Sequence, residues 1–212
     1  MVDMRIKLLC TLLISGFLIS CGNKVNQADY KTEIEIFQTE LNEGYTNEKT
    51  TPLRGENYKN FRQHPFFPID SKYRVDARLV KSENSEYFDF PTSSGRTKRY
   101  REYGKVYFKL DGKKLVLTLF QIENAGKMKG YEKHLFLPFK DLTAGKQTYG
   151  GGKYLDLEIP TSDRMMIDFN RSYHPYCAYN AYDYSCPIVP AENNLPVEIK
   201  AGVMYEDVYF EH

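Results

Sequence analysis

The chain has 212 residues and contains no Trp, but it has 18 Tyr and 13 Phe, so its large apolar side chains are mostly Tyr and Phe. It carries 29 basic and 28 acidic residues, which leaves no excess of positive charge to contact a phosphate backbone. The composition argues against a nucleic-acid-binding protein, and the length suits one domain of ordinary size.

The N-terminus has the pattern of a bacterial lipoprotein signal. Arg5 and Lys7 precede an apolar run, Leu8–Ile19, that is too short to cross a membrane. The tetrad Leu-Ile-Ser-Cys that ends at Cys21 resembles a lipobox, in which the cysteine is acylated and becomes the first residue of the mature chain. An ordinary cleaved signal with a chance cysteine is the alternative. We expect a lipoprotein signal peptide over residues 1–20 and lipidation of Cys21.

Lipidation would attach the protein to a membrane of the cell envelope. Gly22 is not the aspartate that retains lipoproteins in the inner membrane under enteric-type sorting, so the outer membrane is the favoured location. Residues 21–27 are expected to form a polar tether. Residues 28–212 are expected to form a single β-rich domain.

A helical pattern follows the tether. Between Ala28 and Glu43 apolar residues recur at helical spacing, and Gly44 is placed to end the element. The apolar positions are Tyr30, Ile34, Phe37 and Leu41. The other faces are rich in Glu, whereas a helix lying on a membrane favours a basic polar face. The pattern predicts an amphipathic helix that packs on the domain.

Beyond an irregular, proline-containing stretch at 50–70, the pattern becomes that of strands. Apolar and charged residues alternate from Tyr73 to Leu79, which indicates a strand with one buried face. Asp111-Gly112, between two β-rich runs, predicts a tight hairpin turn. The expected strands are 73–79, 88–91, 97–103, 106–110, 115–122, 134–139, 153–159, 165–169 and 197–203. The sequence therefore predicts a mainly β fold, an antiparallel sandwich or partly closed barrel with one N-terminal amphipathic helix.

Two cysteines remain once Cys10 leaves with the signal and Cys21 takes the lipid. In an oxidising envelope Cys177 and Cys186 are expected to form a disulfide. A metal site with His174 is the alternative, but a structural zinc site takes four ligands and these three lack the usual spacing. We therefore expect neither a metal nor a cofactor.

Several blocks of the sequence resemble a family known as a domain of unknown function, DUF1684. The resemblance rests on His64–Asp70 with Tyr73–Val75, Pro91-Thr92 with Gly95-Arg96, Leu135–Phe139, Tyr149–Asp156, Asp168–Arg171 with Pro175–Tyr179, and Ser185–Pro187 with Glu192-Asn193. It implies one β-rich unit that occurs in bacteria and archaea and has no assigned activity. The family pattern usually has Asn at the position of His174, which weakens any catalytic or metal-binding role for this residue.

The glycine run Gly150-Gly151-Gly152, between Tyr149 and Lys153, is superficially like a phosphate-binding loop. A P-loop would need Ser or Thr after the lysine and a helix behind it, but Tyr154 and a strand pattern follow here. The run is expected to be a sharp turn into a strand, placed where a side chain would collide with a neighbouring segment. The alternative is a site where bare backbone lets a ligand approach closely.

A second polar segment follows the predicted strand 165–169. It contributes Asp168, Asn170, Arg171, His174 and Tyr176, which are groups that a sugar, a peptide or a small carboxylate could contact. The same residue types also hold long loops together by bonding to their own backbone. Both interpretations stay open from the sequence.

These observations lead to one expected function and two rivals. We expect a pocket, rimmed by 149–153 and 168–176, that binds a polar small molecule or a glycan fragment, with Arg74 or Arg96 as the anion partner. The first rival is a hydrolase acting on an envelope substrate, with Asp168 or His174 as its acid or base. No Gly-x-Ser-x-Gly motif is present, so the sequence identifies no catalytic residues. The second rival is a structural or interaction subunit.

Overall fold

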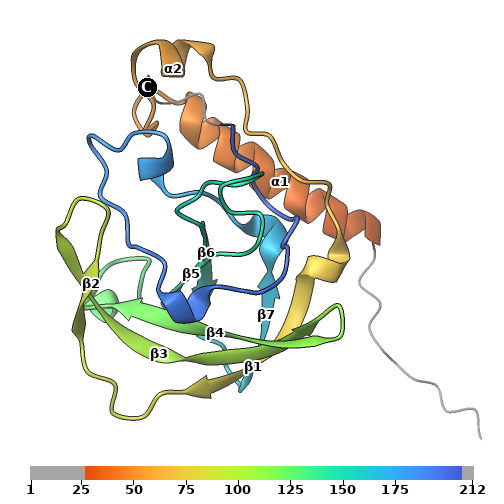
Figure 1. Ribbon diagram of the computed structural model, residues 1–212, viewed down its shortest axis with the longest axis vertical. Helices are drawn as coiled ribbons and strands as arrows, with labels where there is room; N and C mark the ends of the chain where they lie inside the picture. Colours follow the sequence, from red (N-terminus) through yellow and green to blue (C-terminus); the bar gives the residue numbers. More distant parts are fainter. Residues whose placement is uncertain (1–26, 207–212) are drawn as a thin grey trace, which may run out of the picture.

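The computed structural model describes residues 27–206 (Figure 1). The predicted signal peptide, Cys21 and most of the predicted tether lie outside these residues. The described chain is built on a seven-stranded antiparallel sheet that curves into a half-barrel, in the order β6-β5-β4-β3-β1-β7, with β2 paired to β3. The helices and strands are α1 (Gln27–Thr46), α2 (Gly55–Asn60), β1 (Arg74–Lys81), β2 (Phe88–Pro91), β3 (Thr97–Leu110), β4 (Lys113–Ile122), β5 (His134–Phe139), β6 (Lys153–Glu158) and β7 (Arg164–Asp168). The predicted mainly β fold with one N-terminal amphipathic helix is confirmed.

Helix α1 lies alongside the curved sheet (Figure 1). The short helix α2, which the sequence pattern did not predict, lies near the C-terminal end of α1. Tyr30 and Ile34 of α1 are buried, whereas Ile36 on its other side is exposed. No helix within residues 27–206 is both long enough and apolar enough to span a membrane.

The hairpin between β3 and β4 forms as predicted. Asp111 and Gly112 both have positive φ, 47° and 76°, and Leu110 pairs with Lys113 across a two-residue turn. Strand β3 joins two stretches that the sequence suggested as separate strands, with an irregularity between Glu102 and Gly104. A Cβ at position 104 would lie 2.5 Å from the carbonyl oxygen of Val80, so glycine is required at this close approach.

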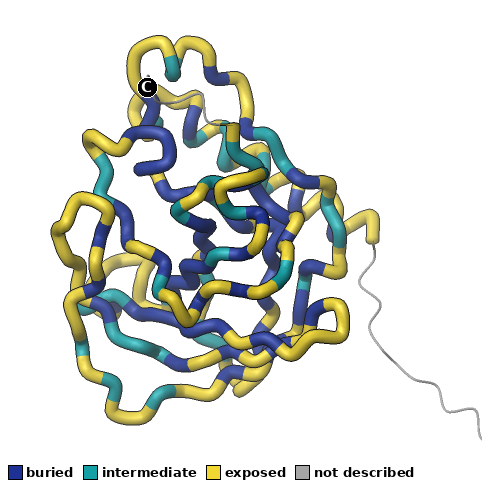
Figure 2. Tube along the Cα trace, viewed as in Figure 1, coloured by how far each residue is buried: buried dark blue, intermediate teal, exposed yellow. Residues whose placement is uncertain are grey.

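The concave side of the sheet holds the main core (Figure 2). Alternating residues of every strand except β2 point into it and meet apolar residues from the C-terminal segment. Its fully buried members include Leu117, Leu119, Leu135, Leu137, Phe139, Ile167, Phe169, Ile199 and Ala201. A second, smaller aromatic cluster contains Phe90, Tyr100, Phe120, Phe136 and Tyr154 together with Cys177 and Cys186.

The predicted last strand, 197–203, is wrong. Ile199, Ala201 and Val203 are buried and Lys200 is exposed, as the apolar alternation suggests, but Gly202 is buried as well and the segment joins no ladder of the sheet. Its backbone groups are satisfied elsewhere: Ile199 N–H donates to the Asp141 carboxylate, and Val203 N–H donates to the carbonyl of Ser172. The apolar alternation in the sequence therefore indicates burial but not strand pairing. The backbone of this segment bonds to the side chain of Asp141 and to the loop at Ser172 instead of to a neighbouring strand.

Candidate functional site

A groove lies between β6 and β7, the two end strands of the sheet order. These strands are consecutive in the chain and are joined by residues 159–163, yet neither is the other's ladder partner, so they form a splayed hairpin. The groove has a volume of about 340 Å³. We call it the seam groove; it is lined by Glu33, Arg74, Leu155, Asp156, Leu157, Glu158, Met166, Asp168 and Arg171.

Two arginines occupy the same end of the seam groove. Arg74 starts β1 and pairs in register with Asp168, and Arg171 belongs to the short 3-10 turn η3 (Phe169–Arg171) that follows β7. Glu33 of α1 is an ion-pair partner of both, at 3.4 Å from Arg74 and 3.3 Å from Arg171. The guanidinium of Arg74 also lies over the ring of Tyr30, 5.1 Å from its centroid. Helix α1 thus positions both cations at the edge of solvent.

Asp168 is buried at the same end of the groove. Its Oδ1 accepts hydrogen bonds from the Tyr30 hydroxyl at 3.1 Å and from the Asn170 backbone N–H at 3.0 Å. Its Oδ2 is buried and has no hydrogen-bond partner among the described residues. Burial and the nearby carboxylate raise the pKa of Tyr30, so its hydroxyl remains a proton donor. One carboxylate oxygen of Asp168 is therefore fixed and the other keeps its accepting capacity.

Asn170 is fully used by the protein itself. Its Oδ1 accepts from the backbone N–H of Asp70 at 3.2 Å, and its Nδ2 donates to the carbonyl of Asp70 at 2.9 Å and to the Tyr30 hydroxyl at 2.8 Å. It is buried and does not line the seam groove. Asn170 therefore positions Asp168 and Tyr30, in the role of a loop residue that bonds to backbone.

Asp156 projects from the other wall of the groove. Its Oδ2 accepts from the Tyr173 hydroxyl at 2.6 Å, and its Oδ1 lies 2.7 Å from Nε2 of His134. A second hollow of about 680 Å³ shares this stretch of β6 and is also lined by Gly130, Glu132, Lys133 and His134. Sequence reasoning missed His134. Alternation in the predicted strands 134–139 and 153–159 could have placed it on one face with Asp156, but only the register makes them neighbours.

The glycine turn is a packing device. Gly152 has φ +98°, and a Cβ there would lie 2.6 Å from the carbonyl oxygen of Phe139 and 2.8 Å from Cγ2 of Val189. Side chains other than hydrogen are thus excluded by conformation and by space. At Gly151 a Cβ would meet the ring of Tyr149, whereas Gly150 has ordinary clearance.

Lys153 is not available to a ligand, which corrects the expectation that it rims a pocket. Its side chain is buried, lies 3.1 Å from the equally buried Asp141, and donates to the carbonyls of Ile199 at 2.8 Å and Ala201 at 3.3 Å. Burial lowers the pKa of Lys153, and Asp141 opposes that shift. The lysine therefore ties the C-terminal segment to the core.

The two polar segments do meet, but they meet inside the protein. The backbone N–H of Tyr149 donates to Nε2 of His174 at 3.3 Å, and Tyr154 pairs with Tyr173 through two backbone bonds. His174 is buried, and its Nδ1 lies 3.3 Å from the hydroxyl of Tyr179. Burial lowers the pKa of His174 well below its usual value, and the positive charge of Lys153 lowers it further. His174 is therefore neutral. We expected residues 149–153 to rim the binding pocket, and this was wrong for the seam groove, because none of these residues lines it.

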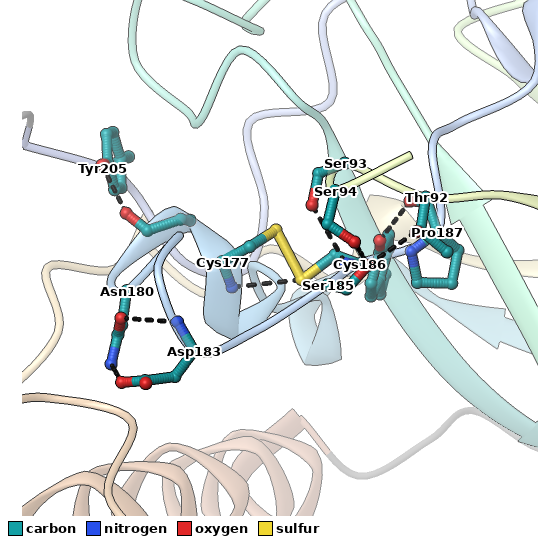
Figure 3. Close-up of a disulfide and its surroundings, with 12 residues drawn as sticks. Thr92, Ser93, Ser94, Cys177, Asn180, Asp183, Ser185, Cys186, Pro187 and Tyr205 are labelled. Carbon is teal, nitrogen blue, oxygen red and sulfur yellow. Dashed lines mark hydrogen bonds between the residues drawn. A yellow bond between two sulfur atoms is a disulfide. The ribbon is translucent and has the colours of Figure 1, made fainter. Parts of the chain in front are cut away.

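Tyr176 and Arg96 belong to segments next to the disulfide: Tyr176 directly precedes Cys177, and Arg96 bonds to Ser94, which lies near Cys186 (Figure 3). The structure joins Cys177 to Cys186 as predicted, with their Cα atoms 6.0 Å apart. Tyr176 is partly exposed and packs against Tyr184, with ring centroids 5.0 Å apart. Arg96 donates from Nε to the hydroxyl of Ser94 at 3.2 Å. Neither Tyr176 nor Arg96 lines the seam groove.

Of the residues predicted for ligand binding, three therefore come together in the seam groove: Arg74, Asp168 and Arg171. No group of three or more His, Cys, Asp or Glu side chains within residues 27–206 is arranged to hold a metal ion.

Comparison with known proteins gives a family and a fold. The chain is 32% identical to an uncharacterized protein of Haloarcula marismortui with a solution NMR structure; the match covers 84% of this chain and 95% of that one, with a TM-score of 0.65. No curated protein matches the chain. The family model described as a protein of unknown function, DUF1684, matches residues 59–204. The chain belongs to the DUF1684 family.

Proposed function

We propose that the protein is a lipid-anchored component of the cell envelope that binds a polar small molecule or a glycan fragment in the seam groove. The observation that carries this proposal is that Arg74, from the start of β1, meets Asp168 and Arg171, from the end of β7 and the turn after it, in one groove of about 340 Å³. A volume of this size lies in the range of small-molecule sites, about 300–1,000 Å³.

The chemistry of the walls indicates what the groove would select. Arg74 and Arg171 supply hydrogen-bond donors with positive charge, and a carboxylate on the ligand would take the place that Glu33 holds between them. The exposed carboxylate of Glu158 supplies acceptors for ligand hydroxyl or amino groups. The best ligand therefore carries an acidic group together with hydrogen-bond donors.

The lipid anchor rests on the N-terminal sequence. Helix α1 begins at Gln27, only six residues after Cys21, so an acylated Cys21 would hold the domain close to a membrane surface. Labelling with radioactive palmitate tests this part: we expect the wild-type chain to be labelled and to fractionate with membranes, and Cys21→Ser to lose both properties. A wild-type chain that stays unlabelled would overturn the anchor and leave the groove untouched.

Ligand binding is tested by thermal shift with three sets of compounds: neutral sugars, sugar acids and small zwitterions. We expect acidic compounds to raise Tm, Arg171→Ala to abolish the rise, and Arg78→Ala to retain it. Arg78 is the matched control because it forms a surface ion pair with Asp163 at 3.6 Å and does not line the groove. If none of the compounds raises Tm, or if both variants respond equally, the proposal fails.

The hydrolase alternative has less support. His174 is enclosed by aromatic residues and lies outside the groove, so we assign it no acid–base role. Asp168 lines the groove, but Tyr30 and Asn170 hold its Oδ1 and its Oδ2 is buried, which suits a structural carboxylate better than an acid or base.

A further inference from the structure

The wall of the seam groove formed by β6 carries free backbone groups. Tyr154 turns its N–H and its carbonyl away from β5, because both bond to Tyr173, at 2.8 Å and 3.1 Å. The direction of these groups alternates along an antiparallel strand, so Asp156 and Glu158 face the same way as Tyr154. Within residues 27–206, neither Asp156 nor Glu158 has a backbone partner on that side. The edge of β6 is thus an unfinished ladder that lines a groove.

The neighbouring segment begins that ladder and then leaves it. Tyr173 pairs with Tyr154 in antiparallel fashion. An antiparallel continuation would place Arg171 opposite Asp156, but residues 169–171 form the turn η3 and run toward β7 instead. The row opposite Asp156 and Glu158 therefore stays open, and it is this row that the groove follows.

We propose that the ligand of the seam groove is a short peptide with free termini, about three residues long, which adds to β6 as an antiparallel strand. The inference rests on the proposed function, since it names the ligand class of the same groove. Its basis is β-augmentation, in which main-chain hydrogen bonds to an open edge supply affinity.

In this arrangement the chain direction of the peptide places each of its charged termini beside a side chain of opposite charge. A strand antiparallel to β6 runs toward the Tyr154 end, so its first residue lies opposite Glu158 and its third opposite Asp156. Its carboxylate then points to the end of the groove that holds Arg74 and Arg171. Its ammonium group lies beside the carboxylate of Glu158. Reversal would set each terminus against a like charge, which is unfavourable.

The length of the peptide follows from the strand geometry. With a rise of about 3.4 Å per residue, the row from Asp156 to Glu158 spans about 7 Å, the distance between the first and third residues of an extended peptide. Beyond Glu158, residues 159–163 connect β6 to β7 and close the groove. Beyond Asp156, Tyr173 already occupies the next position. A much longer peptide would meet an obstacle at either end.

The test uses the full chain with trialanine and with two isosteric esters of it. An ester in place of the second amide removes the N–H that would donate to the carbonyl of Asp156, and we expect it to weaken binding about threefold to tenfold. An ester in place of the first amide removes an N–H that faces away from β6, so we expect it to bind like trialanine. Equal affinity of the two esters would overturn the strand arrangement.

Backbone amide exchange measured by NMR gives an independent readout. We expect saturating trialanine to slow exchange at the amides of Asp156 and Glu158 at least tenfold. Glu158→Pro removes one edge N–H and is expected to weaken binding more than Glu158→Ala, which keeps that N–H and loses only the carboxylate. Proline is tolerated at an outward position of an edge strand, and a circular-dichroism spectrum verifies that each variant is folded.

The outcomes separate this inference from the proposed function. If sugar acids raise Tm through Arg171 while trialanine neither binds nor protects the two amides, the peptide inference fails and the proposed function stands. If no compound of either kind binds, both fail.

Discussion

Replacing Gly152 with alanine is expected to destabilise the fold by about 2 to 5 kcal/mol. At φ +98° a side chain costs of order 1–3 kcal/mol in backbone strain. The new Cβ would also lie 2.6 Å from a backbone oxygen, of Phe139, and overpacking of this kind costs about 1–3 kcal/mol. A reduction in unfolded-chain entropy of about 0.4–1 kcal/mol offsets part of this.

Urea denaturation measures the effect, and Gly150→Ala is the matched control. A Cβ at position 150 would come no closer than 3.8 Å to Cα of Gly145, so this variant should lie within about 1 kcal/mol of wild type. We expect the midpoint to fall for Gly152→Ala with the slope m unchanged. A Gly152→Ala protein with the wild-type midpoint would refute the account of the turn as a close-packing device.

Three further predictions concern buried groups. Lys153→Met should lower the free energy of unfolding by about 3–5 kcal/mol, because it leaves Asp141 buried without its cation. Adding Asp141→Asn should recover part of that loss, and a double variant no more stable than the single one would contradict this. Burial lowers the pKa of His64 to about 4, below its unfolded value of about 6.5, so the unfolded chain binds the extra proton first and stability falls as pH drops from about 6.5 to 4. Urea titrations at pH 7 and pH 4.5 should differ by about 2–3 kcal/mol from this group alone, and His64→Phe should remove that part of the difference; an unchanged pH dependence would count against it. Opening the disulfide with Cys177→Ser and Cys186→Ser together should cost about 3 kcal/mol in the chain-entropy model, measured by the same titration under oxidising conditions, and a loss below 1 kcal/mol would contradict the estimate.

Local sequence patterns predicted the elements whose backbone conformation is decided by neighbouring residues. The Asp111-Gly112 turn and the helix that buries Tyr30 and Ile34 are decided by residues close in sequence. The segment 197–203 shows the limit of this reasoning. Alternating burial is the same for a strand and for a loop laid over a core, and the difference lies in distant partners such as Asp141.

The site was predicted in part for a similar reason. Arg74, Asp168 and Arg171 are polar groups beside strand ends, and the sheet brings them together. Lys153 has the same surface-like chemistry in the sequence, but its environment is set by Asp141, twelve residues away in the loop after β5. His134 was missed because its contact with Asp156 depends on the register of β5 and β6, which composition does not reveal.

The proposed function requires that the seam groove is the binding site. Amide chemical-shift mapping of the full chain tests it most directly, with the compound that gives the largest thermal shift. We expect the perturbed amides to cluster at Arg74, Asp156, Glu158, Asp168 and Arg171, and Arg171→Ala to remove these perturbations. Perturbations centred on Arg96 or on the glycine turn at 150–152, with the groove unaffected, would contradict it.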